Sequence, residues 1–326
     1  MLKGEIMLFK LSNGKSLGFF AILIIGIVLP NINALAVSKN GFDLTNATIS
    51  QQHIFCGGPA KDGIPAILEP RLITAISASY LKPDDRVIGV ELDDISSAYP
   101  ISILNWHEIV NDKINQHSFA VTYCPLCGTG IAFYSKLGGM DAQFGVSGLL
   151  YNSDVLLYDR ETESLWSQIL GEAISGELVG QKLRAIPISH TTWRDWLNQH
   201  PDTMVLLDDT GFSRDYSRNP YQGYEKSRSL YFQVNNKAPD TYHPKEQVVG
   251  VELEGVFKAY PFVELEKQGL AKFEDTVKGI PITIVWDSVN RSVKLYDKNN
   301  ERIAGVQGFW FAWFTFHPDT LVFKGG

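Results

Sequence analysis

The sequence predicts an α+β fold that is mainly β, with two pseudo-symmetric duplicated halves and a long insertion in the first half. Short apolar stretches rich in β-branched and aromatic residues, bounded by Gly or Pro, predict many strands and few helices. A set of motifs recurs along the chain in the same order. The 326 residues, 44% hydrophobic and 20% charged, are enough to bury a large core.

Strands and helices can be placed from these patterns. Two short helices are expected in the first half. The one over residues 100–110 begins with a proline, and the one over residues 192–200 has its tryptophans on one stripe. The expected strands are residues 87–92, 119–123 and 131–134 in the first half, and residues 248–253, 282–286 and 292–296 in the second.

The repeat defines the expected domain organisation. VIGVELDDISSAYP at residues 87–100 returns as VVGVELEGVFKAYP, 161 residues later. A Trp-x-x-Trp-x-x-x-His-Pro-Asp-Thr segment beginning at Trp193 returns at Trp310. Residues 136–192 have no counterpart of similar length in the second half and are expected to be an insertion. The predicted units are an N-terminal extension (37–85), a first repeat with the insertion and the candidate site (86–207), a connector (208–247) and a second repeat that acts as scaffold (248–326).

The N-terminus has the pattern of a secretory signal. Three lysines precede an apolar run over residues 17–29, and the small-x-small sequence Ala-Leu-Ala ends at Ala36. We expect residues 1–36 to be a signal peptide and the exported protein to begin at Val37. An uncleaved membrane anchor is the alternative. The expected location is periplasmic or extracellular, with membrane contact only through this segment if it stays uncleaved.

Charge and motif content exclude several classes of protein. The chain has 29 basic and 36 acidic residues, so it lacks the basic footprint of a nucleic-acid-binding protein. Neither a P-loop nor a strand-anchored Gly-x-Gly-x-x-Gly motif occurs, and we expect no nucleotide cofactor. Three cysteines are too few for a disulfide scaffold. The expected partner is a small molecule or a protein of the cell envelope.

The sharpest local motif is Cys124-Pro125-Leu126-Cys127-Gly128. A turn of this form places two sulfurs on the same side, which suits copper, zinc or iron. The chain has no second knuckle, so a metal site must recruit His, Asp, Glu or water and would stay open. Two alternatives remain: a redox-active pair of thiols and a static disulfide. The sequence alignment of the halves places Trp286 and Val289 at the two cysteine positions, which assigns function to the first half.

Other side chains complete the predicted site. His107 precedes the strand that leads into Cys124, and we expect it to be the third metal ligand. His53 with Cys56 is the fallback. In the insertion, Asp159 and Glu161 are candidates for a catalytic acid or base, or for groups that support the ligands; a charged hairpin end is the alternative.

Seven stretches of the chain, in order, match a known family: DGIPAI (62–67), VIGVEL and AYPISIL (within 87–104), WHEIVND (106–112), VTYCPLCGTGIAF (121–133), FGVSGLLYNSDVLLYDRETESLWSQ (144–168), TTWRDWLNQHPDT (191–203) and RDYSRNPYQGYE (214–225). By these stretches the chain resembles the DUF3179 family, whose members are exported or membrane-associated proteins of unknown function. The resemblance implies no activity, substrate or catalytic residue, and whether the protein is an enzyme is left open. Three functions therefore stay possible: a metal-binding protein, a thiol–disulfide protein using Cys124 and Cys127, and a non-catalytic binding module.

Overall fold

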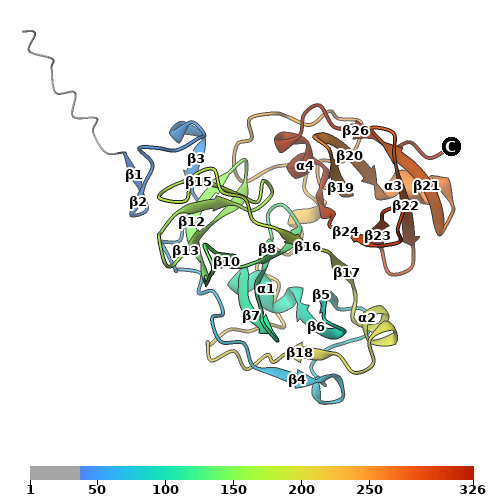
Figure 1. Cartoon of the computed structure of the whole chain (residues 1–326), viewed down its shortest axis with the longest axis horizontal. Coiled ribbons are helices and arrows are strands. Elements are labelled where there is room, and N and C mark those ends of the chain that lie inside the picture. Colours follow the sequence, from blue (N-terminus) through green and yellow to red (C-terminus); the bar gives the residue numbers. More distant parts are fainter. Residues whose placement is uncertain (1–36) are drawn as a thin grey trace, which may run out of the picture. The chain divides into compact units, whose positions relative to one another are not determined.

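The computed structural model describes residues 37–326, and Figure 1 traces them along the chain. This part of the chain contains 26 strands and four α-helices of seven residues each, so the prediction of a mainly β fold is confirmed. The predicted signal peptide lies outside the described residues. Among the helices of residues 37–326, none has the length and apolar character needed to cross a membrane.

The first half contains two groups of paired strands. Strands β17, β5, β6 and β18 form one sheet in that order, with β4 at its edge, and β7, β8 and β9 are paired in a second sheet to which β16 adds. The elements are β4 Leu72–Thr74, β5 Arg86–Leu92, β6 Ile95–Pro100, α1 Ile101–His107, β7 Ile109–Ile114, β8 His117–Cys124, β9 Thr129–Tyr134, β16 Ala185–Ile186, β17 Ile188–Thr192, α2 Trp193–Gln199 and β18 Met204–Leu206.

The second half has elements in the same order. Strands β25, β19, β20 and β26 are paired in one sheet, and β21, β22, β23 and β24 in another. The elements are β19 Gln247–Leu253, β20 Val256–Pro261, α3 Phe262–Gln268, β21 Lys272–Val277, β22 Ile280–Asp287, β23 Ser292–Tyr296, β24 Arg302–Ile303, β25 Val306–Phe309, α4 Trp310–Phe316 and β26 Leu321–Val322. Strand β25 also pairs with β9 of the first half, so one eight-stranded sheet includes strands from both halves.

The repeated Gly and Trp residues make the same contact in both halves. Trp196 of α2 lies against Gly89 of β5, and Trp313 of α4 lies against Gly250 of β19. A Cβ atom on either glycine would lie 2.3 Å from the indole ring. Both tryptophans are buried, and each indole N–H donates to the threonine seven residues further on. The glycines are therefore required because a helix packs directly on the strand backbone.

Four strands of the insertion and β3 of the N-terminal extension form a five-stranded sheet, β15-β14-β13-β12-β3. Its apolar side chains, including Phe144 and Trp166, join Cys124 and Cys127 in one buried cluster. The insertion therefore covers the cysteine turn. Its elements and those of the N-terminal extension are β1 Ser38–Lys39, β2 Phe42–Asp43, the 3-10 helix η1 Gln51–His53, β3 Ile54–Cys56, the 3-10 helix η2 Ala75–Ser77, β10 Lys136–Leu137, β11 Met140–Asp141, β12 Phe144–Tyr151, β13 Asp154–Asp159, β14 Leu165–Ser167 and β15 Glu172–Ser175.

The connector over residues 208–247 is mostly irregular and has one 3-10 helix, η3 Tyr224–Lys226. It is hydrogen-bonded to both the insertion and the second half. Asn235 N–H donates to the side chain of Asn152 in the insertion, and the Asn236 side chain donates to the carbonyl of Thr315 in α4. The connector thus holds the insertion and the second half together.

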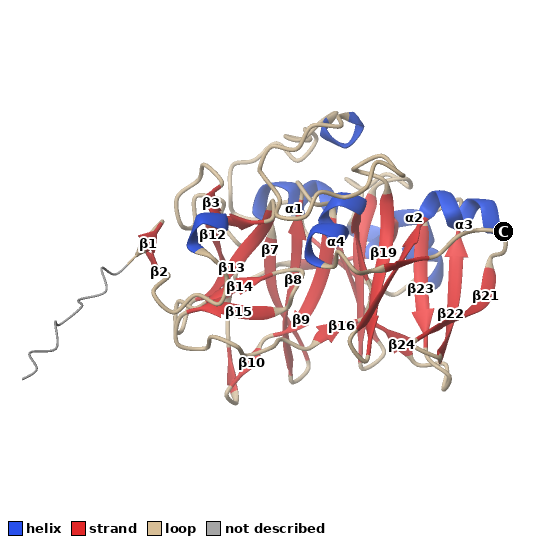
Figure 2. Ribbon diagram, turned by 90° about the horizontal axis from the view of Figure 1, so that it is seen from above, coloured by secondary structure: helices blue, strands red, loops and turns tan. Residues whose placement is uncertain are grey.

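The four α-helices lie along one side of the strands (Figure 2).

Two details of the prediction are wrong. The helix expected over residues 100–110 ends at His107, because Glu108 adopts a positive φ of 57° and the chain then enters β7. The sequence alignment of the two halves is also one residue out of register at the turns that join β8 to β9 and β22 to β23. Cys124 pairs with Thr129 across its turn, whereas Asp287 pairs with Ser292.

The counterparts of the two cysteines, counted from the turns, are therefore Asp287 and Asn290, not Trp286 and Val289. The sequence alignment missed this because it kept the tyrosines that end the following strands in register. Asp287 and Asn290 hydrogen-bond to each other across the second turn, with 2.8 Å between Asn290 Nδ2 and Asp287 Oδ2. In this turn the two side chains therefore serve as hydrogen-bond partners for each other.

Candidate metal centre

The two cysteines lie in the turn between β8 and β9. Cys124 is the last residue of β8, and the Cys127 N–H donates to its carbonyl at 3.2 Å. Gly128 follows with a φ of +62°, and a Cβ atom there would lie 3.1 Å from the Phe309 ring. Arg291 adopts a φ of +46° at the corresponding place in the second half. The positive φ is thus common to both turns, whereas the close approach of Phe309 is a further constraint on Gly128.

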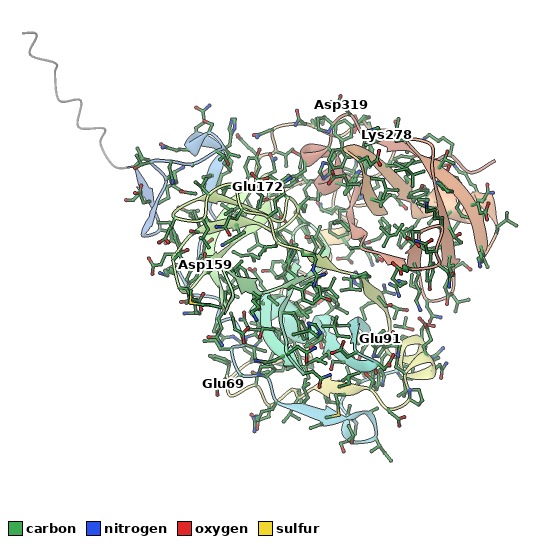
Figure 3. The ribbon with its side chains drawn as sticks, viewed as in Figure 1. Glu69, Glu91, Asp159, Glu172, Lys278 and Asp319 are labelled. Carbon is green, nitrogen blue, oxygen red and sulfur yellow. The ribbon has the colours of Figure 1, made fainter. Side chains whose placement is uncertain are left out.

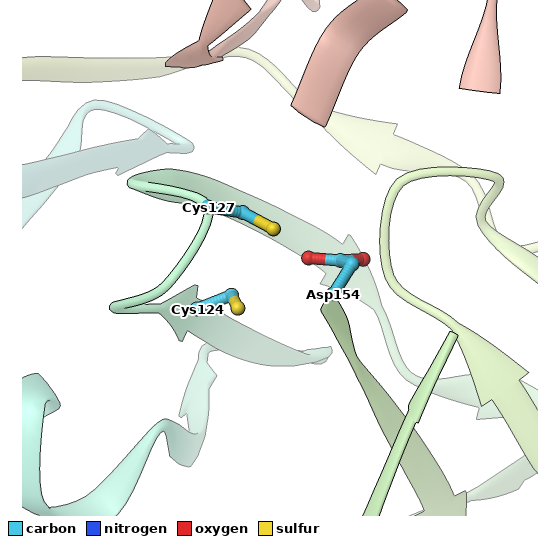
Figure 4. Close-up of side chains that lie close together, drawn as sticks. All are labelled: Cys124, Cys127 and Asp154. Carbon is cyan, nitrogen blue, oxygen red and sulfur yellow. The ribbon is translucent and has the colours of Figure 1, made fainter. Parts of the chain in front are cut away.

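A hairpin of the insertion brings a carboxylate to these sulfurs. Asn152 and Ser153 form the two-residue loop between β12 and β13, both with positive φ, as in a type I′ turn. The Ser153 carbonyl accepts from the Cys127 thiol at 3.3 Å and faces Cys124 Sγ at 3.8 Å. Asp154 comes next, and one ligand atom from each of Cys124, Cys127 and Asp154 lies within 4.8 Å of the other two (Figure 4).

Hydrogen bonds fix the carboxylate of Asp154. Its Oδ2 accepts from the Ile169 N–H at 3.2 Å, and its Oδ1 lies 3.2 Å from the Thr129 hydroxyl, whose single proton also faces Gln168 Oε1 at 2.7 Å. Thr129 is the residue that pairs with Cys124 across the turn. The same turn therefore orients both the thiols and the carboxylate, and each carboxylate oxygen keeps lone-pair capacity for a further partner.

Burial favours the protonated forms of all three groups. Cys124, Cys127 and Asp154 are each at most 1% exposed. Burial raises the pKa of Asp154 to about 7, raises the pKa of the Cys124 thiol, and raises the pKa of the Cys127 thiol well above its usual value. Within residues 37–326, no Lys, Arg or His forms an ion pair with Asp154. A bound cation would supply the missing positive charge and displace the protons.

Glu108 is a fourth buried acidic group beside the thiols. It lines a cavity of about 150 Å³ together with Cys124, and its carboxylate forms no hydrogen bond or ion pair with any described residue. Burial, followed by the charge of Asp154, raises the pKa of Glu108 to about 8. The Glu108 side chain enters the cavity because the positive φ of this residue ends α1 and turns the chain. The remaining walls of the cavity are mainly apolar and aromatic, with Leu126, Val146, Leu150, Tyr221 and Phe232 among them.

The structure does not bring His107 to the cysteines. His107 is fully buried, and both ring nitrogens are hydrogen-bonded: Nδ1 to the Pro65 carbonyl at 2.7 Å and Nε2 to the Tyr216 hydroxyl at 2.6 Å. Burial lowers its pKa. The residue that reaches the cysteine cavity from this helix end is its neighbour Glu108. The third member of the candidate ligand group is therefore Asp154 and not the predicted His107.

Asp159 and Glu161 also lie apart from the thiols. Asp159, labelled in Figure 3, ends β13. It is five residues from Asp154, which corresponds to roughly 16 Å along a strand. It accepts hydrogen bonds from the Thr162 N–H and the Trp166 indole N–H, so its contacts hold a turn together. Glu161 is exposed and accepts from the Gln143 N–H.

The fallback ligands are separate as well. Cys56 is exposed, lies on β3 and pairs with Leu149 of β12, and neither it nor His53 belongs to the group formed around Cys124. Asp154 is the residue that sequence reasoning missed. Its signal is a carboxylate directly after an Asn-Ser pair between two apolar runs, which marks a hairpin turn with a charged residue at the start of a buried strand.

The fold and the site together define a class: a mainly β protein whose first half holds a buried group of two thiols and a carboxylate. The model of the DUF3179 family, described as a protein of unknown function, matches residues 61–320. The chain therefore belongs to this family. The matched region includes the first half with its insertion, the second half as far as residue 320, and every residue of the candidate site. Comparisons with curated proteins and with solved structures gave no match.

Proposed function

We propose that Cys124, Cys127 and Asp154 bind a transition metal ion and that the protein works through this site. The observation that carries the proposal is the burial of these three groups together with Glu108. All four are acidic, and within residues 37–326 none is paired with a basic side chain. Unpaired buried acids are costly in their charged forms, and a metal ion offsets that cost by coordinating them.

The donor set favours a divalent ion. Two thiolates and one carboxylate suit zinc or iron, whereas copper(I) prefers soft sulfur ligands alone. Three protein ligands leave a position open on a four-coordinate ion, and catalytic zinc sites have this arrangement. The cavity lined by Cys124 supports the same inference, because it leaves space for a small ligand next to this cysteine.

Glu108 is the residue we assign to proton transfer at this site. Its carboxyl lines the cavity, and burial raises its pKa, which favours the protonated form in the metal-free protein. A bound metal would supply Lewis-acid activation of a small molecule in the open position. Glu108 would then donate or accept a proton there, while the apolar walls limit access of water. Asp159 and Glu161 have no part in this assignment.

The test is elemental analysis of protein purified from its native source without chelator. We expect one zinc or iron per chain in the unchanged protein. Substituting Cys124→Ser or Asp154→Asn should remove the metal. The matched control is Cys56→Ser, the same substitution at an exposed cysteine outside the group, which should keep it. A metal content that is the same in all four proteins would overturn the assignment of the ligands.

A thiol–disulfide function is the second candidate, supported by the short separation of the two sulfurs. In that case the two thiols would be oxidised together to a disulfide, releasing two protons and two electrons to an external oxidant. Alkylation separates the candidates. Metal-bound thiolates become reactive only after a chelator is added, whereas a redox pair becomes reactive only after reduction.

We further propose that the two halves arose by duplication and that the protein is exported. The matching order of strands and the shared Gly–Trp contact support the first proposal, and superposition of residues 86–135 on 247–297 in an experimental structure tests it. The lysines and apolar run before Ala36 support the second. N-terminal sequencing should find Val37 first; an intact residue 1 in the membrane fraction would indicate an anchor instead. A small molecule is the partner we propose.

A further inference from the structure

We infer that a second site, the cleft between the two halves, binds a small organic acid whose carboxylate faces Arg86. The cleft has a volume of about 320 Å³ and is separated from the cavity that contains Cys124 by Tyr221, which lines both. Its polar lining comes from corresponding positions of the two halves. Arg86 begins β5 and Gln247 begins β19, while His190 of β17 corresponds to Gln307 of β25.

The two sides of the cleft differ in charge. The first half contributes the guanidinium of Arg86, and the second half contributes a neutral amide at the matching place, Gln247. Arg291 of the second half also lines the cleft, but its charge is paired with Glu266 at 2.6 Å. Glu225 also lines the cleft, and its side chain is exposed to solvent. Arg86 is therefore the cation of the cleft that has no carboxylate partner among the described residues.

The contacts of Arg86 leave it able to bind an anion. Its guanidinium donates to three backbone carbonyls, those of His190, Asn290 and Arg291. A guanidinium has five N–H donors, so two stay available, and carbonyls do not neutralise its charge. Burial lowers the pKa of Arg86 to about 10, and the group therefore stays charged at neutral pH. A carboxylate is one of the ligand groups whose planar, two-oxygen geometry matches a guanidinium.

Two further polar atoms in the cleft residues lack partners. His190 Nδ1 and Gln247 Oε1 are buried without a hydrogen bond to any described residue. His190 is 8% exposed, and burial together with the charge of Arg86 lowers its pKa well below the usual value, so its ring is neutral. Buried polar atoms are normally hydrogen-bonded. His190 and Gln247, which both line the cleft, therefore keep hydrogen-bonding capacity that no described residue uses.

The remaining walls indicate an organic ligand and not an inorganic oxyanion. Tyr123, Tyr221, Phe262 and Phe309 line the cleft with aromatic surface. Pockets for small molecules combine apolar and aromatic walls with a few placed polar groups, and about 320 Å³ lies at the lower end of their size range. An acid with a small, flat, apolar body fits this lining. The inference uses none of the metal ligands and stands independently of the proposed metal function.

Titration calorimetry of the purified protein with benzoate tests the inference. Benzoate carries a carboxylate on a flat ring, and benzamide is its uncharged counterpart. We expect benzoate to bind at least tenfold more tightly than benzamide and Arg86→Gln to weaken benzoate binding at least tenfold. The control is Arg71→Gln, which removes an exposed arginine paired with Asp209 and should leave binding unchanged.

A second variant guards against loss of folding in Arg86→Gln. Asn105 is partly exposed and lines the cleft, so Asn105→Asp adds a negative charge there with almost no change in shape and should weaken benzoate binding several-fold. Equal binding of benzoate and benzamide, no effect of either variant, absence of benzoate binding, or binding of inorganic phosphate in its place would each overturn the inference. Cys124→Ser should bind benzoate normally, which separates this result from a failure of the metal proposal.

Discussion

The two hairpin turns of the molecule share a backbone path and differ in chemistry. In the second half, Asp287 and Asn290 satisfy each other by hydrogen bonds, and the turn is partly open to solvent. In the first half, Cys124 and Cys127 stand at the same places, and the insertion buries them and adds Asp154. The comparison teaches that the hairpin shared by the two halves is not enough to form the candidate site. The insertion completes the site, because it both excludes water and contributes Asp154, the third candidate ligand.

The largest effect is expected from removing the two tryptophans that make the same Gly–Trp contact in both halves. Trp196→Ala and Trp313→Ala each delete a buried indole that packs on a strand glycine and donates to a threonine. We expect each to lower the free energy of unfolding by about 3–5 kcal/mol, measured by denaturant titration. Similar losses in the two variants would support equivalent roles. A loss confined to one half would show that the frames are not energetically alike.

The histidines beside these tryptophans should separate the halves by their pH dependence. His317 packs between Phe257 and Trp313, and burial lowers its pKa to about 4. Burial also lowers the pKa of His200 in the first half, but Glu91, 3.9 Å away, opposes the shift. His317 is thus neutral in the folded protein, whereas the unfolded chain takes up a proton below about pH 6.5.

The stability that His317 contributes is therefore present above pH 6.5 and is lost as the pH falls toward 4. The shift corresponds to a loss on the order of 3 kcal/mol over this window. His317→Phe, which keeps the ring stacking, should flatten the pH dependence of the unfolding free energy. His200→Phe should flatten it less. A larger effect from His200→Phe would contradict the difference in environment between the two histidines.

Much of the fold was predictable because it follows from local pattern. Alternation of apolar residues located strands in both halves, and the repeated motifs located the corresponding elements. The end of α1 was not predictable in this way. Residues 101–110 keep an apolar helical pattern, and the helix stops only because Glu108 takes a positive φ that leads the chain into β7 beside its partner β8. A tertiary pairing overrode a local preference.

The site was half predictable for a related reason. Cys124 and Cys127 are close in sequence, so their turn reveals them, whereas Asp154 reaches them only through the folding of the insertion sheet. His107 was predicted as the third ligand, and it is its neighbour Glu108 that lines the cavity beside Cys124. Neighbouring residues at a helix end point in different directions, so Glu108 faces the cavity and His107 faces Pro65 and Tyr216. Sequence spacing cannot resolve which of two adjacent side chains enters a site.

A smaller effect is expected from the two glycines beneath the tryptophans. Gly89→Ala and Gly250→Ala each place a Cβ 2.3 Å from an indole ring, too close for a fixed neighbour. We expect each substitution to cost about 2–3 kcal/mol of unfolding free energy, because the helix must shift away from the strand. Thermal or denaturant unfolding of the two single variants measures this. An unchanged midpoint in either would mean that its tryptophan is not held against the strand.

The smallest expected effect tests why the two turns carry different residues at one place. Gly128→Ala adds a Cβ 3.1 Å from the Phe309 ring and keeps a positive φ, which together should cost about 1–2 kcal/mol of unfolding free energy. Arg291 shows that a side chain tolerates the left-handed conformation in the second turn. If contact with Phe309 is the reason for glycine, the cost of Gly128→Ala should fall in a Phe309→Leu background, giving a coupling of about 0.5–1 kcal/mol in a double-mutant cycle. A cost that is the same in both backgrounds would place the requirement in the backbone conformation alone. The turns would then differ in strain and not in the packing that β25 of the second half imposes on the first.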